Sequence, residues 1–162
     1  MSLLIRKVNK AKWVQGDIEN DSDVSADAIT SCLRTTKNTL SVWQINTEDD
    51  LDNAILALVS NQDHLEAIDV VILEEESISK YNIKIIATPG ETPIAGLSQT
   101  HRDLAELTYS KLGNIKDHIV ERIRTDQLKR YTRGAIKKLI LTAIEEGKIE
   151  LTDLKESIRQ KI

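Results

Sequence analysis

The stretch at residues 67–76, A-I-D-V-V-I-L-E-E-E, decides how the rest of the chain is interpreted. It joins an apolar run rich in β-branched residues to three carboxylates that end the run abruptly. Such a run is shorter than a typical helix, and it indicates a strand that is covered on both faces. We therefore predict a buried strand at residues 68–73.

Two elements just upstream extend this prediction. Residues 39–45 alternate in hydropathy and indicate a second strand, and residues 48–60 carry an apolar stripe of helical period. Thr47 can cap that helix, with Asp50 in the position where a capping box usually has Glu or Gln. Because a crossover of this length favours parallel pairing, the strands at 39–45 and 68–73 are predicted to be parallel neighbours with a right-handed connection.

The remaining chain falls into two parts. Residues 3–8 and 82–87 are further strand candidates, and the loop T-P-G-E-T-P at residues 88–93 contains both prolines of the chain. Beyond it the pattern is helical, beginning with a helix that bears Leu97, Leu104 and Leu107.

The predicted fold is therefore α/β or α+β. It has a small mixed sheet of about four strands, containing one parallel β-α-β unit, followed by a helical C-terminal region. In domain terms, residues 1–95 form the sheet region and residues 96–162 form a helical region packed on it as one compact unit.

Composition limits the class of protein. The 162 residues suit one ordinary domain, and aromatic residues make up only 3%, which argues against a surface built to stack nucleotide bases. Cys32 is the single cysteine, so an intramolecular disulfide and a Cys-based zinc site are excluded. The N-terminal apolar run is too short for a signal peptide, and no stretch is long enough for a membrane span. We expect a cytoplasmic protein without a membrane partner.

The formal net charge of −4 hides a strong asymmetry. Residues 116–138 carry eight basic and three acidic side chains, a net of +5, which leaves −9 for the rest of the chain. The candidate partner-binding residues in and around this segment are Arg124, Lys129, Arg130, Arg133, Lys137 and Lys138. Lys and Arg that neutralise phosphates supply most non-specific nucleic-acid affinity.

The spacing within this segment suggests one helix face. Arg130, Arg133 and Lys137 recur at i, i+3 and i+7, after a predicted turn at residues 126–131 that would give helix-turn-helix geometry without a full signature. The alternative is a solvated face that balances acidic surface in the same chain or in a partner.

The acidic end of the strand at 68–73 is the first place to look for chemistry. Ligands bind at the carboxyl ends of strands in open parallel sheets, and a carboxylate there could bind a cation or act as a base. The alternative for Glu74, Glu75 and Glu76 is a solvated strand end. No Gly-rich phosphate loop or nucleophile elbow accompanies them.

A family resemblance rests on three scattered positions. Arg6 on the first strand, Ser41 in T-L-S-V-W, and the E-x-E of Glu74 and Glu76 come in the order Arg, Ser, Glu. This order resembles ADP-ribosyltransferases, in which the Arg and Ser hold NAD and the Glu acts at the ribose. The chain departs from the pattern, since no second Ser or Thr flanks Ser41 as expected. The resemblance implies a nucleotide-dependent enzyme with weak catalytic candidates at these four residues.

Other features point away from metals and cofactors and towards assembly. His64, His101 and His118 are far apart and form no metal-binding motif, so no metal and no cofactor are predicted. Leu151, Leu154, Ile158 and Ile162 give the last helix an apolar edge that either docks on its own domain or meets another subunit.

Three functions follow, in order of preference. The first is a non-enzymatic intracellular interaction module, or an accessory subunit of a protein complex, with a protein partner or a second copy of the chain. The second is nucleic-acid binding through the basic C-terminal helices. The third is an enzyme that acts on a nucleotide-like ligand with Arg6 and Glu74 or Glu76.

Overall fold

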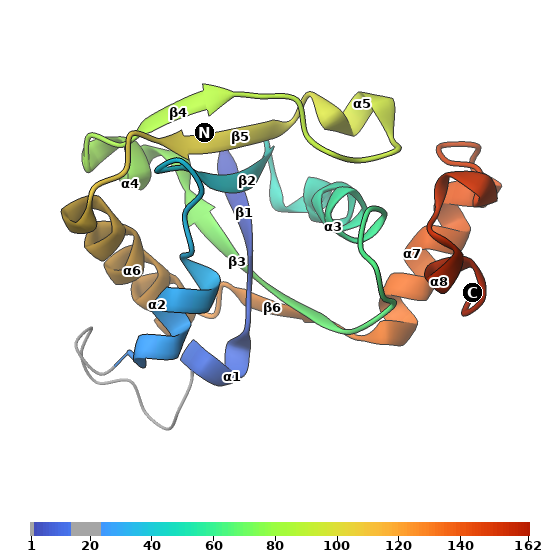
Figure 1. Ribbon diagram of the computed structural model, residues 1–162, viewed down its shortest axis with the longest axis horizontal. Helices are drawn as coiled ribbons and strands as arrows, with labels where there is room; N and C mark the ends of the chain where they lie inside the picture. The colour runs from blue at the N-terminus through green and yellow to red at the C-terminus, as the bar shows by residue number, and fades with distance from the viewer. Residues whose placement is uncertain (1, 14–23) are drawn as a thin grey trace.

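The computed structural model describes residues 2–13 and 24–162. Six strands form one sheet in the order β4-β5-β2-β1-β3-β6, shown in Figure 1. They are β1 (Leu3–Val8), β2 (Leu40–Ile45), β3 (Ile68–Glu74), β4 (Lys84–Ala87), β5 (His101–Ala105) and β6 (Leu128–Tyr131). Every pairing in the sheet is antiparallel.

The prediction of about four strands with a parallel β-α-β unit is wrong. β2 and β3 run in the same direction, but β1 lies between them and pairs antiparallel with both. The connection α3 (Leu51–Val59) does cross from β2 to β3, as its apolar stripe indicates. The first strand of the chain occupies the position between β2 and β3, so these two strands do not pair and the fold is α+β with an antiparallel sheet.

The helical C-terminal region also needs correction, because two of the six strands belong to it. The predicted helix with Leu97, Leu104 and Leu107 is instead α5 (Ala95–Ser98) followed by β5, and the predicted turn at 126–131 contains β6. β5 and β6 have five and four residues and are mostly polar, so a sequence pattern carries little strand signal there. Strands from both sides of the 95/96 boundary pair within one sheet.

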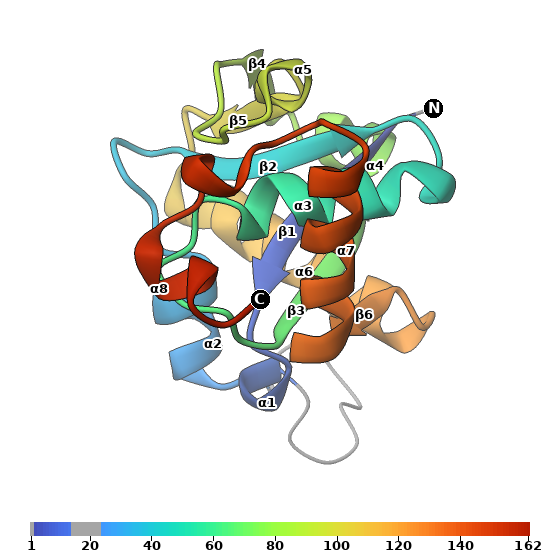
Figure 2. The same cartoon turned by 90° about the vertical axis from the view of Figure 1, so that its right-hand side faces the viewer.

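Helices cover both faces of the sheet, as Figures 1 and 2 show. On one face, here called the α3 face, α3 and α7 (Arg133–Glu145) pack with η3 (Leu151–Asp153) and α8 (Glu156–Arg159). On the other, the α6 face, lie α1 (Lys10–Trp13), α2 (Ala26–Cys32), α4 (Glu75–Lys80) and α6 (Tyr109–Arg124). A short η2 (Glu48–Asp50) precedes α3. β3 has neighbours on both sides and helices on both faces, and all of its residues but Glu74 are buried.

Several local features follow from short-range residue patterns. The Ser25 hydroxyl caps α2 by accepting the Ala28 N–H, Thr132 caps α7 in the same way, and Gly147 follows α7 with a φ of 72°. The terminal apolar edge docks on its own domain through Leu154 and Ile158, which are buried in the core of the α3 face. Within the described ranges, none of the helices has the length and apolar character that crossing a bilayer requires.

Candidate functional site

A buried carboxylate organises the lower end of the sheet. Asp69, near the start of β3, accepts the Lys10 N–H at 3.0 Å through Oδ2 and the Arg130 Nη1–H at 3.0 Å through Oδ1. It thereby ties the first residue of α1 and the edge strand β6 to β3. The Asp69 side chain is 9% exposed and that of Arg130 is 56% exposed, so the pair shows mainly its cation to solvent.

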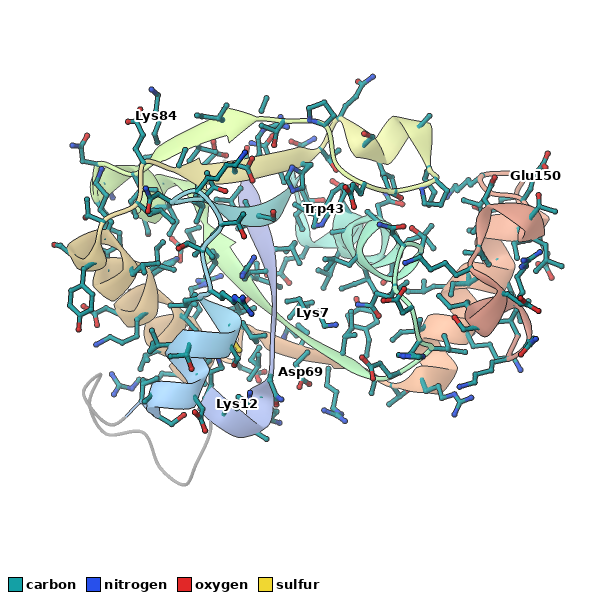
Figure 3. All side chains as sticks on the ribbon, in the orientation of Figure 1. Lys7, Lys12, Trp43, Asp69, Lys84 and Glu150 are labelled. Carbon is teal, nitrogen blue, oxygen red and sulfur yellow. The ribbon has the colours of Figure 1, made fainter. Side chains whose placement is uncertain are left out.

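Basic side chains from three separate parts of the chain lie at this end of the sheet, on both of its faces: Asp69 and Arg130 point to the α6 face. Lys7 and Lys129 both lie opposite Val70, one on each neighbouring strand, and so they share the α3 face. Arg133 begins α7 two residues after β6 ends. We call the group the basic edge, and it consists of Lys7, Lys10, Lys12, Lys129, Arg130 and Arg133. Figure 3 labels Lys7, Lys12 and Asp69 in the lower half of the molecule, around the end of β1.

The backbone of β6 is open along the same edge. The Ile72 N–H donates to the Gln127 carbonyl at 3.0 Å, and Val70 pairs with Lys129. Since hydrogen-bonded pairs alternate along an antiparallel ladder, the peptide groups of Leu128 and Arg130 point away from β3. Among the described residues, no backbone hydrogen bond outside the ladder engages them. The outer side of β6 therefore offers donors and acceptors beside basic side chains.

A cavity of about 400 Å³ adjoins the basic edge where β1 leaves β2. The two strands pair only through residues 3–5 of β1, and α2 ends beside the gap. Of the lining residues, Arg6, Lys7 and Lys12 are basic, and none of the described ones is acidic. The Lys12 ammonium donates to the Ser31 hydroxyl at 3.1 Å at the rim.

Arg6 is a structural part of this cavity wall. Its Nη2 donates to the Cys32 carbonyl at 2.7 Å and its Nη1 to the Ser41 carbonyl at 2.7 Å. Burial lowers the pKa of the guanidinium, and the nearby Cys32 opposes that shift. No carboxylate among the described residues pairs with Arg6, so its positive charge adds to the field of the cavity.

The basic residues predicted from the sequence do not form one helix face. Arg130 lies on β6, whereas Arg133, Lys137 and Lys138 are exposed on α7 and Arg124 is the last residue of α6. On α7, Arg133 and Lys137 are one turn apart and border the stripe of the buried Ile136 and Ile140. These residues are therefore divided between β6 and the helices before and after it, which differs from helix-turn-helix geometry.

The four weak catalytic candidates are not assembled. Arg6 donates to Ser41, but only to its backbone carbonyl. Arg6 lies across from Val71, whereas Glu74 lies across from Leu3 at the start of β1. Glu74 accepts from Arg122 Nη1 at 2.5 Å, and Glu76 forms an exposed pair with Lys80 in α4. An Arg-Ser-Glu site for NAD is therefore not formed by these side chains.

Glu74 belongs instead to a structural cluster with α6. Arg122 also donates through Nε to the Ile72 carbonyl at 2.7 Å, where β6 no longer covers the edge of β3. The Nε2 of the fully buried His118 accepts the Glu74 N–H at 3.1 Å. Burial lowers the pKa of His118, against the opposing effect of Glu121 and Glu74. His118 is thus a neutral core residue that fixes the end of β3.

Sequence reasoning missed the N-terminal half of the basic edge. The run R-K-V-N-K-A-K at residues 6–12 holds four basic residues in seven and was a visible signal. Its place beside the C-terminal basic segment depends on β1 and β6 flanking β3, which no local pattern reveals.

The described residues contain no group of three or more His, Cys, Asp or Glu side chains that could hold a metal ion. Comparison of the chain with family models, with curated proteins and with solved structures finds no match.

Proposed function

We propose that the protein is an interaction module that binds an extended, acidic segment of a protein partner along the basic edge. One observation carries the proposal: the outward peptide groups of Leu128 and Arg130 lie on a strand whose own and neighbouring side chains are basic. An added strand would gain main-chain hydrogen bonds from β6, and its carboxylates would meet the basic edge.

The buried Asp69 supports this proposal electrostatically. Its charge is already neutralised by Arg130 and by the Lys10 N–H, so it does not cancel Lys7, Lys12, Lys129 or Arg133. The rest of the chain carries an excess of acidic residues, which concentrates the attraction for an anionic partner at this one region.

Nucleic acid is the second candidate, favoured by the number of basic side chains at the edge and on α7. A phosphate backbone would use these charges but would have no use for the outward peptide groups of β6. The one aromatic ring of β6, Tyr131, donates its hydroxyl to Asp52 at 3.0 Å and packs against the core of the α3 face. Stacking of bases on this strand is therefore not favoured.

Binding experiments can separate the two candidates. The probes are a labelled ten-residue peptide of alternating Glu and Val and a labelled duplex of twenty base pairs, each titrated at low and at moderate salt. The test variant is the double change Lys129→Glu and Arg133→Glu. The control is Arg159→Glu with Lys161→Glu, which changes the net charge equally at two exposed residues of the C-terminal segment.

We expect the peptide to bind the unaltered protein, and the test variant to bind it at least about ten-fold more weakly at low salt, while the control stays within about two-fold. Backbone hydrogen exchange at Leu128 and Arg130 should slow when the peptide is bound. Duplex binding without that protection would favour the nucleic-acid candidate, and no binding of either probe would remove both.

A further inference from the structure

A second cavity, of about 450 Å³, lies on the α3 face over β2 and β5 and shares no lining residue with the basic edge. Its floor is made by β2 and β5, where Ser41 lies directly opposite Asp103 and Trp43 opposite His101. Its walls are the C-terminal end of α3 and the loop that follows β4. Figure 3 labels Trp43 in this upper part of the molecule.

The wall contributed by the loop is held in place by close packing. A Cβ at Gly90 would overlap the Trp43 ring and lie 2.8 Å from the His101 Cβ, so only glycine fits there. The Gly90 N–H donates to the Ser98 carbonyl at 2.9 Å, and the Ser98 hydroxyl donates to the Gly90 carbonyl at 2.8 Å. The rings of Trp43 and His101 meet edge to face at 5.1 Å. The cavity is therefore largely preformed.

Hydrogen bonding fixes the proton positions on the floor. The Thr88 Oγ1 lies 3.1 Å from Asp103 Oδ2 and 2.8 Å from His101 Nδ1. Because a carboxylate can only accept, the single hydroxyl proton of Thr88 goes to Asp103, and Nδ1 of His101 carries a proton that it donates to Thr88. In the neutral imidazole, Nε2 of His101 is then an acceptor, and among the described residues no hydrogen bond engages it.

The two carboxylates of the cavity keep free acceptor positions. Asp103 receives Thr88 and, at 3.5 Å, the Ser41 hydroxyl, which leaves lone pairs on both oxygens. Glu91 receives one donor, the Asn61 amide at 3.4 Å. No Lys or Arg is among the described lining residues. A ligand must therefore supply donors and, facing two carboxylates, a positive charge.

From this we infer that the cavity formed by Ser41, Thr88, Glu91, His101 and Asp103 binds a ligand through a guanidinium or primary ammonium group. A planar guanidinium has five donors and no acceptor, which matches the free oxygens of Asp103 and Glu91 and the Nε2 of His101. The group can belong to a small free molecule or to an arginine side chain of a partner.

Calorimetric titration with matched probes tests this inference. Butylguanidinium represents a free ligand, the peptide acetyl-Gly-Arg-Gly-amide represents a partner side chain, and butylurea is the uncharged control of nearly the same shape. The variants are Asp103→Asn and Glu91→Gln, and Asp49→Asn is the control, because Asp49 is exposed on η2 and outside the cavity. Thermal unfolding of each variant confirms that it is folded.

We expect at least one cationic probe to bind, at least about ten-fold more tightly than butylurea, and to lose about ten-fold in affinity with Asp103→Asn but not with Asp49→Asn. Tighter binding of butylguanidinium than of the peptide would identify a free ligand, and the reverse would identify a partner side chain. The inference is overturned if neither cationic probe binds, if butylurea binds equally well, or if both the Asp103 and Glu91 variants keep full affinity.

Discussion

The two ends of β3 carry the same chemical pair, an arginine on a carboxylate, in opposite orientation with respect to solvent. At the start of the strand the Asp69 side chain is 9% exposed and Arg130 is 56% exposed. At its end Glu74 is 33% exposed and Arg122 only 14%. The first pair therefore presents a cation and the second an anion. Both pairs have the same composition. Because the arginine is the more exposed member only in the first pair, only that end of the strand is a candidate anion-binding surface.

The largest effect is expected from a substitution at Asp69, which tests the pair at the start of β3. Replacing Asp69 by alanine removes the acceptor of the Lys10 N–H and the partner of Arg130, both charge-assisted bonds, and should lower the free energy of unfolding by about 3 kcal/mol. Urea denaturation measures this change. Asp49→Ala, at an exposed residue, is the control and should change stability by no more than about 0.5 kcal/mol. A loss at Asp69 as small as that of the control would contradict the role of this carboxylate as an anchor.

The second test is the pH dependence that His118 gives to the Glu74 end. Burial lowers the pKa of His118 below its ordinary value of 6.5. Between the ordinary pKa of the unfolded state and the lowered pKa of the folded state, the unfolded chain binds more protons than the folded one. The stabilisation is therefore complete above pH 6.5 and falls as the pH drops below it.

Substituting His118 by leucine leaves the Glu74 N–H without its acceptor and should cost about 2 kcal/mol at neutral pH. The variant should also have a flatter stability profile from neutral pH into mild acid than the unaltered protein. Chemical denaturation at a series of pH values measures both, and an unchanged profile would mean that His118 does not titrate within the fold.

Replacing Glu74 by glutamine should have a smaller effect. The amide keeps an acceptor for Arg122 Nη1, and the Nε bond of Arg122 to the Ile72 carbonyl stays, so we expect a loss of about 1 kcal/mol. Peptide binding at the basic edge should not change, because Glu74 lies at the far end of β3. If this variant weakened the peptide as much as the Lys129/Arg133 double change, the two ends would not be independent.

The smallest effect is expected for Glu76→Gln. Glu76 and Lys80 form an i,i+4 pair on α4 with side chains that are 51% and 71% exposed. Pairs of this kind contribute about 0.3 kcal/mol, so the melting temperature should be almost unaltered. A loss above about 1 kcal/mol would show that Glu76 has a role that its exposed position does not reveal.

The acidic end of β3 lies in a different setting from the one that the sequence predicted. The rule that ligands gather at the carboxyl ends of strands holds for parallel sheets, in which all such ends lie on one side. In this antiparallel sheet the neighbours of β3 run the other way, so Glu74 lies beside the start of β1, at Leu3. The Arg-Ser-Glu order does not bring its residues together either, since Arg6 lies opposite Val71 and Glu74 lies opposite Leu3.

The sequence pattern identified the basic residues of the C-terminal segment, but it did not predict how they are arranged in space. Net charge per segment is a sum over neighbours in the chain, and it identified Lys129 and Arg133 correctly as part of a basic stretch. The polar floor of Asp103, His101 and Ser41 had no such signal, because its members come from β2 and β5, which meet through a register that spans about sixty residues of chain.

What the sequence by itself determined is local. The buried run of β3, the stripe of α3, the capping box of η2, and the caps at Ser25 and Thr132 follow from residues a few positions apart. Helical and strand periodicity and capping bonds act at that range. The tertiary structure alone decided that β1 separates β2 from β3 and that Lys7 and Lys129 flank Val70. Strand order is settled by competition between distant segments for the same ladder hydrogen bonds and core faces, and nothing in the neighbourhood of one strand records which partner wins.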